Sequence, residues 1–246
     1  MSKDNITPKR RDFIKYTTLG ALAATATVGV GISPYILKAE HRLRPPGAVK
    51  EKEFLALCIK CGQCLQVCPY HSIELGDIGQ GHGVGTPHID ANIRGCYACK
   101  AVPCVLACPS GALDHSIEKA TEIEMGIAVL EHPKRCLAVR KEPVPVGYDK
   151  QMKEFTANHT HTHKLETEQL EKFEGLEGKA CALCADMCPM PNPLSCIEVK
   201  ETKMGIIRPV VYDQCTGCGV CQEVCPTDPP AIVIKPRMEY KDVYKS

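Results

Sequence analysis

The chain has 246 residues and contains 17 Cys, 19 Gly and 19 Pro, but only 4 Phe, 8 Tyr and no Trp. A chain of this length can form one large or two small domains, yet so few aromatic side chains argue against an interior built by side-chain packing alone, and an odd number of cysteines excludes complete disulfide pairing. Residues 1–44 carry 8 Lys/Arg against 3 Asp/Glu and the remainder 22 against 26, so the body is mildly acidic, which argues against nucleic acid as a partner.

Residues 1–44 have the pattern of an export signal. Arg10 and Arg11 stand in KRRDFIK, and an uncharged, weakly apolar stretch follows from Tyr16 to Leu37. Paired arginines before such a stretch indicate the twin-arginine export machinery, a route that suits a protein folded around a cofactor in the cytoplasm. An uncleaved membrane tether is the alternative, because a stretch of this length can span a bilayer. We therefore expect a periplasmic protein with its folded domain at residues 45–246.

Four groups of cysteines follow as an internal repeat. Groups one and four, CIKCGQCLQVCP and CTGCGVCQEVCP, match C-x2-C-x2-C-x3-C-P, whereas group two, CYACKAVPCVLACP, is longer and group three, CALCADMCP, is one cysteine short. In chain order the groups comprise Cys58, Cys61, Cys64 and Cys68; Cys96, Cys99, Cys104 and Cys108; Cys181, Cys184 and Cys188; and Cys215, Cys218, Cys221 and Cys225. A proline follows the last cysteine of every group.

This spacing is typical of cysteines that bind [4Fe–4S] clusters. The first three thiolates of a group can bind one cluster, while the fourth points away and binds another. Zinc would require two C-x2-C pairs rather than a triplet followed by Cys-Pro, and cysteines so closely spaced make a poor disulfide framework. Exchange of the fourth cysteine implies that the groups work in pairs. We expect group one to pair with four and two with three; the alternative is one with two and three with four.

The repeat indicates which cysteine completes group three. MGIAVLEHPKRC ends at Cys136 as MGIIRPVVYDQC ends at Cys215, the first cysteine of group four. Cys136 is therefore expected to be the sixteenth ligand, giving four clusters. Cys196 occupies the repeat position of Ser72, Ala112 and Ala231, and we expect it to be a small buried residue rather than a ligand.

The sequence predicts an α+β fold of two ferredoxin-like modules with short strands and short helices. The expected strands are 127–130, 197–199, 206–212 and 231–234, and helices are expected to begin at or near the Cys-Pro turns. The clusters would supply much of the interior, in place of aromatic side chains.

A polar insertion interrupts the domain at about residues 143–179. Its NHTHTHK segment, with His159, His161 and His163, suggests a solvated insertion, metal binding being the alternative. Its Glu-rich part, Lys164 to Lys179, predicts an exposed amphipathic helix, and an acidic docking face for a basic partner is its functional interpretation.

Several motifs in a fixed order resemble a known family. KRRDFIK, RLRPPGA (residues 42–48), CGQCLQVCPY, CPSGALD, MGIAVL and CTGCG together resemble the ferredoxin-type proteins of the periplasmic nitrate reductase system, the NapG/MauM family. The resemblance implies four [4Fe–4S] clusters, an exported position and a membrane iron–sulfur partner that oxidises quinol. It also favours Cys136 as a ligand with Cys181, Cys184 and Cys188. The polar insertion departs from the family pattern.

These observations predict an electron-transfer subunit of a quinol dehydrogenase complex, with no catalytic site of its own. Electrons would pass from the membrane partner to a periplasmic cytochrome or nitrate reductase subunit. The alternative is the iron–sulfur subunit of another exported molybdenum or amine-oxidising oxidoreductase.

Overall fold

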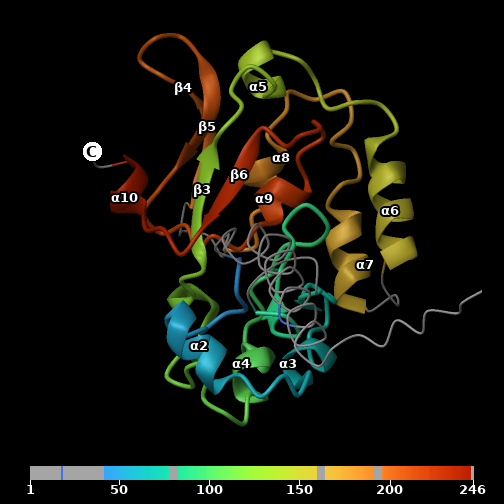
Figure 1. Cartoon of the computed structure of the whole chain (residues 1–246). Helices are drawn as coiled ribbons and strands as arrows, with labels where there is room; N and C mark the ends of the chain where they lie inside the picture. Colours follow the sequence, from blue (N-terminus) through green and yellow to red (C-terminus); the bar gives the residue numbers. More distant parts are fainter. Residues whose placement is uncertain (1–17, 19–41, 78–82, 160–163, 191–195, 245–246) are drawn as a thin grey trace, which may run out of the picture. The chain divides into compact units, whose positions relative to one another are not determined.

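The computed structural model describes residues 18, 42–77, 83–159, 164–190 and 196–244 (Figure 1). All 17 cysteines lie in a compact unit formed by His41–Gly76 and Gly85–Ser246. The predicted export signal falls almost entirely outside the described residues, as do His161 and His163. Within the described part of the chain, no helix is long and apolar enough to cross a membrane.

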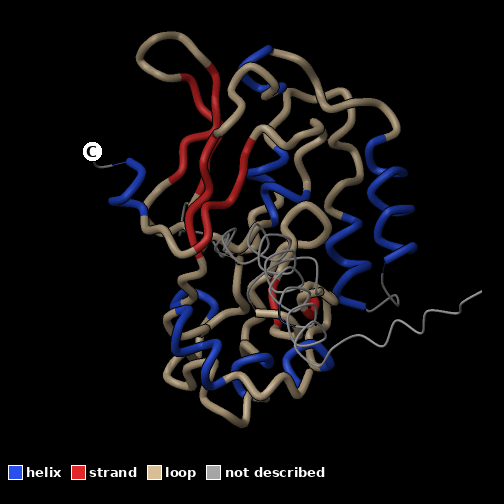
Figure 2. The backbone as a smooth tube through the Cα atoms, in the orientation of Figure 1, coloured by secondary structure: helices blue, strands red, loops and turns tan. Residues whose placement is uncertain are grey.

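Where the chain is described, its strands form three two-stranded antiparallel sheets (Figure 2). They pair β1 (Glu74–Leu75) with β2 (Pro87–His88), β3 (Gly126–Leu130) with β6 (Ile232–Pro236), and β4 (Ile197–Glu201) with β5 (Ile207–Val211). β3, β4, β5 and β6 confirm the four expected strands. Ile127 and Ile232, on β3 and β6, are almost fully buried, so this sheet contributes one wall of the interior.

A four-residue helix lies inside each cysteine group. These helices are α3 (Gln63–Gln66), α4 (Pro103–Leu106), α8 (Leu183–Asp186) and α9 (Val220–Glu223). They end shortly before the Cys-Pro turn, so the prediction that helices begin at or near that turn was wrong. The physical reason is that a residue preceding proline is disfavoured in the helical region, which stops each helix before its group's last cysteine.

The other helices given for the described residues lie before, between and after the cysteine groups. They are α2 (Glu51–Leu57), the 3-10 helix η2 (Ala120–Glu122), α5 (Leu137–Arg140), α6 (Tyr148–His159), α7 (Lys164–Glu171) and α10 (Tyr240–Tyr244). α6 and α7 lie side by side in the polar insertion (Figure 1).

The insertion packs against the cysteine-rich body. Tyr148, Met152 and Thr156 recur at helical spacing along one face of α6 and are buried. The expected Glu-rich helix is shorter than predicted, because α7 ends at Glu171 and Phe173, beyond its end, is only 2% exposed. The segment therefore contributes apolar side chains to a core as well as an acidic outer face.

The two ends of the insertion are joined by backbone pairing. Pro143 and Ala180 form an antiparallel bridge, and the Val144 N–H donates to the Lys179 carbonyl over 2.9 Å. Cys136 precedes the bridge and Cys181 follows it directly. The two ends of the insertion therefore lie next to each other, which brings Cys136 near Cys181 despite the length of chain between them.

The segment that precedes the first cysteine group is also part of the packed body. Arg44 is almost fully buried, where it forms an ion pair with Glu51 and donates to Thr86 Oγ1 and the Pro87 carbonyl over 2.9 and 2.8 Å. Glu51 also pairs with Arg237, which follows β6. This ion-pair network ties the N-terminal segment to the C-terminal end of the fold.

Candidate metal centres

The cysteines gather in four sets, which we number I to IV. Site I comprises Cys58, Cys61, Cys64 and Cys108; site II comprises Cys68, Cys96, Cys99 and Cys104; site III comprises Cys188, Cys215, Cys218 and Cys221; and site IV comprises Cys136, Cys181, Cys184 and Cys225. Each set therefore takes three thiols from one group and the fourth from another, as the exchange of the last cysteine predicts.

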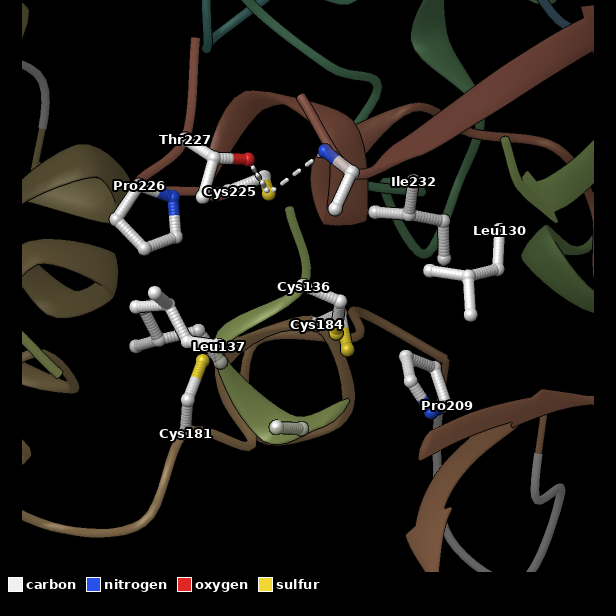
Figure 3. Close-up of a pocket in the computed structure, with 13 residues that line it drawn as sticks. Leu130, Cys136, Leu137, Cys181, Cys184, Pro209, Cys225, Pro226, Thr227 and Ile232 are labelled. Carbon is white, nitrogen blue, oxygen red and sulfur yellow. Dashed lines mark hydrogen bonds between the residues drawn. The ribbon is translucent and has the colours of Figure 1, made fainter. Parts of the chain in front are cut away.

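Sites II, III and IV each line a cavity of similar size, about 360, 320 and 370 Å³. In site IV the Cys225 sulfur faces Cys181, Cys184 and Cys136 across the cavity, and Leu130, Leu137 and Ile232 form apolar walls (Figure 3). In site I the thiols of Cys58, Cys61 and Cys108 lie close enough to Cys64 to act on its charge. Similar cavities with the same donor set indicate that one kind of group fits all of them.

The pairing of groups differs from our favoured expectation. Sites I and II exchange cysteines between groups one and two, and sites III and IV between groups three and four. The expectation that group one pairs with four and two with three was wrong, and the neighbour alternative holds. The reason is packing within each half: α3 contacts α4, and α8 contacts α9, so the fourth cysteine of each group points into its neighbour's site.

Burial makes these thiols costly to ionise in the absence of positive charge. It raises the pKa of Cys64, Cys99 and Cys181 to about 11 and that of Cys104 to about 12, with neighbouring cysteines adding to the effect. Thiolates here need a positively charged group to compensate them. Iron bound by four thiolates supplies that charge, so the donor set fits a cluster.

The spacing of the thiols also distinguishes between kinds of metal group. None of the 17 cysteines forms a disulfide. Among the described residues, no three His, Cys, Asp or Glu donors converge closely enough to hold a single ion. Four thiols spread around a cavity suit a multi-atom cluster better than one tetrahedral zinc ion, whose ligands meet at about 2.3 Å from one point.

Backbone N–H groups support the fourth cysteine of several groups. The Ser72 N–H donates to Cys68 Sγ over 3.4 Å, and the Ala231 N–H donates to Cys225 Sγ over 3.2 Å. Burial opposes ionisation of Cys108, but N–H groups including those of Leu113 and Ala112 outweigh it and lower its pKa. Such N–H···S bonds stabilise charge on sulfur and tune an iron–sulfur centre.

Cys196 lies beside site III but differs from the other lining cysteines. It is 3% exposed, as predicted for a small buried residue, and its thiol donates to the Gln214 carbonyl over 3.0 Å. Its hydrogen bond with Cys188 lowers the pKa of Cys188 and raises that of Cys196. Cys188 is therefore the member of this pair that favours the thiolate form, which leaves Cys196 as a neutral neighbour of the site.

A buried polar network between the two halves was not anticipated from the sequence. Glu223 of α9 forms an ion pair with Arg94 (3.2 Å) and accepts hydrogen bonds from the Gly95 N–H (2.7 Å) and Tyr97 Oη (3.0 Å). Burial raises the pKa of Glu223, while Arg94 and the two donors oppose that rise. The available signal was an acidic residue inside group four, at the place where group one has Gln66.

Comparisons with known proteins bear on the identity of the metal group. A 4Fe-4S dicluster domain matches residues 57–112, which hold groups one and two, and a 4Fe-4S binding domain matches residues 208–230, which hold group four. The ferredoxin-type protein NapG of Escherichia coli is 34% identical over 92% of this chain and 85% of its own length. The methylamine utilization ferredoxin-type protein MauM of Methylorubrum extorquens is 33% identical over 94% of this chain and 90% of its own. No solved structure matches.

The chain belongs to the NapG/MauM family of ferredoxin-type proteins. It is an iron–sulfur protein that binds [4Fe–4S] clusters through cysteines, and its role is electron transfer rather than catalysis. NapG of Haemophilus influenzae, 31% identical over 96% of this chain, is a further relative. Identity to NapG and to MauM is so similar that it does not separate the two branches of the family.

Proposed function

We propose that this NapG/MauM protein holds four [4Fe–4S] clusters at sites I to IV and carries electrons from a membrane quinol-oxidising iron–sulfur partner to the periplasmic nitrate reductase system. The observation that carries the proposal is the division of sixteen cysteines into four sets of four, each completed by a neighbouring group. Sites I and II would form one ferredoxin-like module and sites III and IV the other. The acceptor would be a periplasmic cytochrome or reductase subunit, reached after twin-arginine export of the folded protein.

A [4Fe–4S] cluster bound by four thiolates gains and loses one electron. The protein's own residues supply everything else. The four cysteines of each site would hold it in place, and a short helix contains one cysteine of each site, in order Cys64, Cys104, Cys221 and Cys184. Apolar side chains such as Leu137, Ile232 and Ile73 keep water away from the sulfurs. N–H groups such as those of Ser72 and Ala231 offset charge at the fourth thiolate.

Similarity to MauM supports a second candidate. A relative named for methylamine utilization matches this chain as well as NapG does. The same four sites would then serve another exported molybdenum or amine-oxidising oxidoreductase, with only the docking partner changed.

Membranes can test this proposal directly. Membranes would be prepared from cells of the source organism whose gene for this chain has been deleted, and mixed with the anaerobically purified full chain. A reduced quinol is added first. Nitrate and the soluble periplasmic fraction are added afterwards. We expect bleaching of the iron–sulfur absorbance with quinol and its recovery with nitrate. Reduction without recovery by nitrate would favour the second candidate. Failure of quinol to reduce the protein would contradict the proposed electron source.

A further inference from the structure

The two halves of the protein each contain two sites, and an electron that enters one half has to cross to the other. Groups one and two build sites I and II, and groups three and four build sites III and IV. The place where a ligand of one half touches a ligand of the other is therefore of interest.

Cys96 of site II and Cys218 of site III are joined through their backbones. The Cys96 N–H donates to the Cys218 carbonyl over 2.7 Å. Next to this bond, Gly95 lies flush against Gly219 and Val220: a Cβ on Gly95 would lie 2.7 Å from the Gly219 carbonyl carbon and closer still to the Val220 nitrogen. Only glycine allows two backbones to approach so closely.

The Glu223 side chain makes further contacts with the same segment. Its Oε2 accepts the Gly95 N–H, while its Oε1 pairs with Arg94 and accepts the Tyr97 hydroxyl. The Glu223 side chain is 1% exposed, and Arg94 in turn donates to the Tyr70 carbonyl over 3.1 Å. One carboxylate on the helix of group four thus binds three residues at the start of group two, Arg94, Gly95 and Tyr97, which flank Cys96.

Two further contacts tighten the same junction. The Gln222 amide, next to Glu223, donates to Asn92 Oδ1 over 2.7 Å. The insertion adds Thr156, whose hydroxyl accepts from Arg94 over 3.3 Å, and Tyr148, whose hydroxyl donates to the Val224 carbonyl over 2.8 Å. The insertion therefore covers the junction that Glu223 closes.

We infer that electrons cross between the two halves at the backbone contact of Gly95 and Cys96 with Cys218 to Val220. The sites are then used in the order I, II, III, IV. Glu223 is the positioning residue that keeps the two backbones in contact. This inference rests on the proposed function. In the crossing step one electron leaves the reduced centre at site II, which is oxidised, and enters the oxidised centre at site III, which is reduced, or the reverse. No bond forms or breaks, and no proton is transferred.

Magnetic interaction between reduced centres tests the order without any partner protein. The full chain, loaded with its clusters and reduced by dithionite, would be studied by EPR as wild type, Cys99→Ser (site II) and Cys61→Ser (site I), with iron and sulfide counted in each. We expect loss of site II to remove the part of the splitting of the site III signal that site II causes, leaving the part caused by site IV, and loss of site I to leave the site III signal unchanged. A site III signal that is unsplit in the wild type, or unaffected by loss of site II, would overturn the order. Because dithionite supplies the electrons, failure here is distinct from failure of quinol or nitrate to act.

Glu223→Gln tests the positioning role, with Glu154→Gln as the matched control in an exposed ion pair. We expect Glu223→Gln to keep its full iron content but to weaken the splitting between sites II and III and to slow electron equilibration between the halves several-fold after a reducing pulse. The control should behave as wild type. Gly95→Ala, which forces the backbones apart without changing a charge, should give the same two effects. If both Glu223→Gln and Gly95→Ala retain wild-type splitting and rate, the crossing lies elsewhere. Should Glu223→Gln lose iron, the wild-type and Cys99→Ser spectra still decide the order.

Discussion

The two halves of the protein each form two four-cysteine sites, but the cysteines are spaced differently along the chain in each half. Sites I and II draw all their cysteines from Cys58 to Cys108, and the segment between the two groups contains β1 and β2. Site IV draws on Cys136, which a helical insertion separates from Cys181. The pairing of Pro143 with Ala180 closes that insertion, so the added length costs little loop entropy and the site keeps its form. The geometry of a thiol site therefore depends on the positions of the two chain ends that carry its cysteines, and much less on the length of the chain between them.

The largest expected effect concerns the ligand that the insertion separates from its group. Cys136→Ser should remove one cluster, lowering iron from about sixteen to about twelve per chain, because site IV loses a thiolate. Cys196→Ser is the control and should keep all the iron, since Cys196 is a hydrogen-bonded neighbour of site III. Iron and acid-labile sulfide analysis with reduced EPR spectra would check both. Loss of a cluster in Cys196→Ser, with none in Cys136→Ser, would refute the assignment.

Double variants sharpen the comparison by testing the exchange of the fourth cysteine. Cys136 and Cys225 belong to one site, so the double variant Cys136→Ser/Cys225→Ser should lose only one cluster. Cys136→Ser/Cys188→Ser should lose two, because Cys188 belongs to site III. Iron content of anaerobically purified protein distinguishes a loss of about four from about eight iron per chain. The opposite pattern would mean that each group binds its own cluster.

The sequence predicts the local part of this design well. Cysteine spacing and the repeat ending at Cys136 and Cys215 predicted the sixteen cysteines that the structure gathers into four sets, and short strand-like stretches predicted β3 to β6, because these features depend on the reach of a short loop and the composition of a short strand. The prediction of which groups pair failed because the pairing depends on contacts between separate segments, α3 with α4 and α8 with α9, that no local spacing encodes. Glu223 was missed for the same reason: its partners lie more than a hundred residues away in the chain.

The first half should lose stability when its N-terminal anchor is cut. Arg44→Met would remove a side chain that is only 3% exposed and the hydrogen bonds that it donates to Thr86 Oγ1 and the Pro87 carbonyl. We expect a cost of about 3 kcal/mol, at the low end for a broken buried pair because Glu51 retains Arg237. Anaerobic urea unfolding followed by circular dichroism would measure it.

The matched control for Arg44 is Arg140→Met, which breaks an exposed pair with Glu142. Its cost should be below about 1 kcal/mol. Equal urea midpoints for Arg44→Met and Arg140→Met would show that the buried network stabilises the first half no more than an exposed ion pair does.

The smallest expected effect concerns the anchor of the insertion in the second half. Tyr148→Phe removes a buried hydroxyl that donates to the Val224 carbonyl, and should cost about 1 kcal/mol. Tyr212→Phe, whose hydroxyl donates to Glu198 at the surface, is the control and should cost less. The same urea experiment compares them. A Tyr148→Phe midpoint equal to that of wild type would mean that the insertion does not depend on this contact.

The central claim is that four sets of four thiols, alike in both halves despite the insertion, each hold one [4Fe–4S] cluster. Counting iron, acid-labile sulfide and zinc in the full chain purified without air tests it most directly. The account predicts about sixteen iron and about sixteen sulfide per chain in a brown protein with no zinc. A well-folded, colourless protein, or one that holds zinc in place of iron, would contradict it.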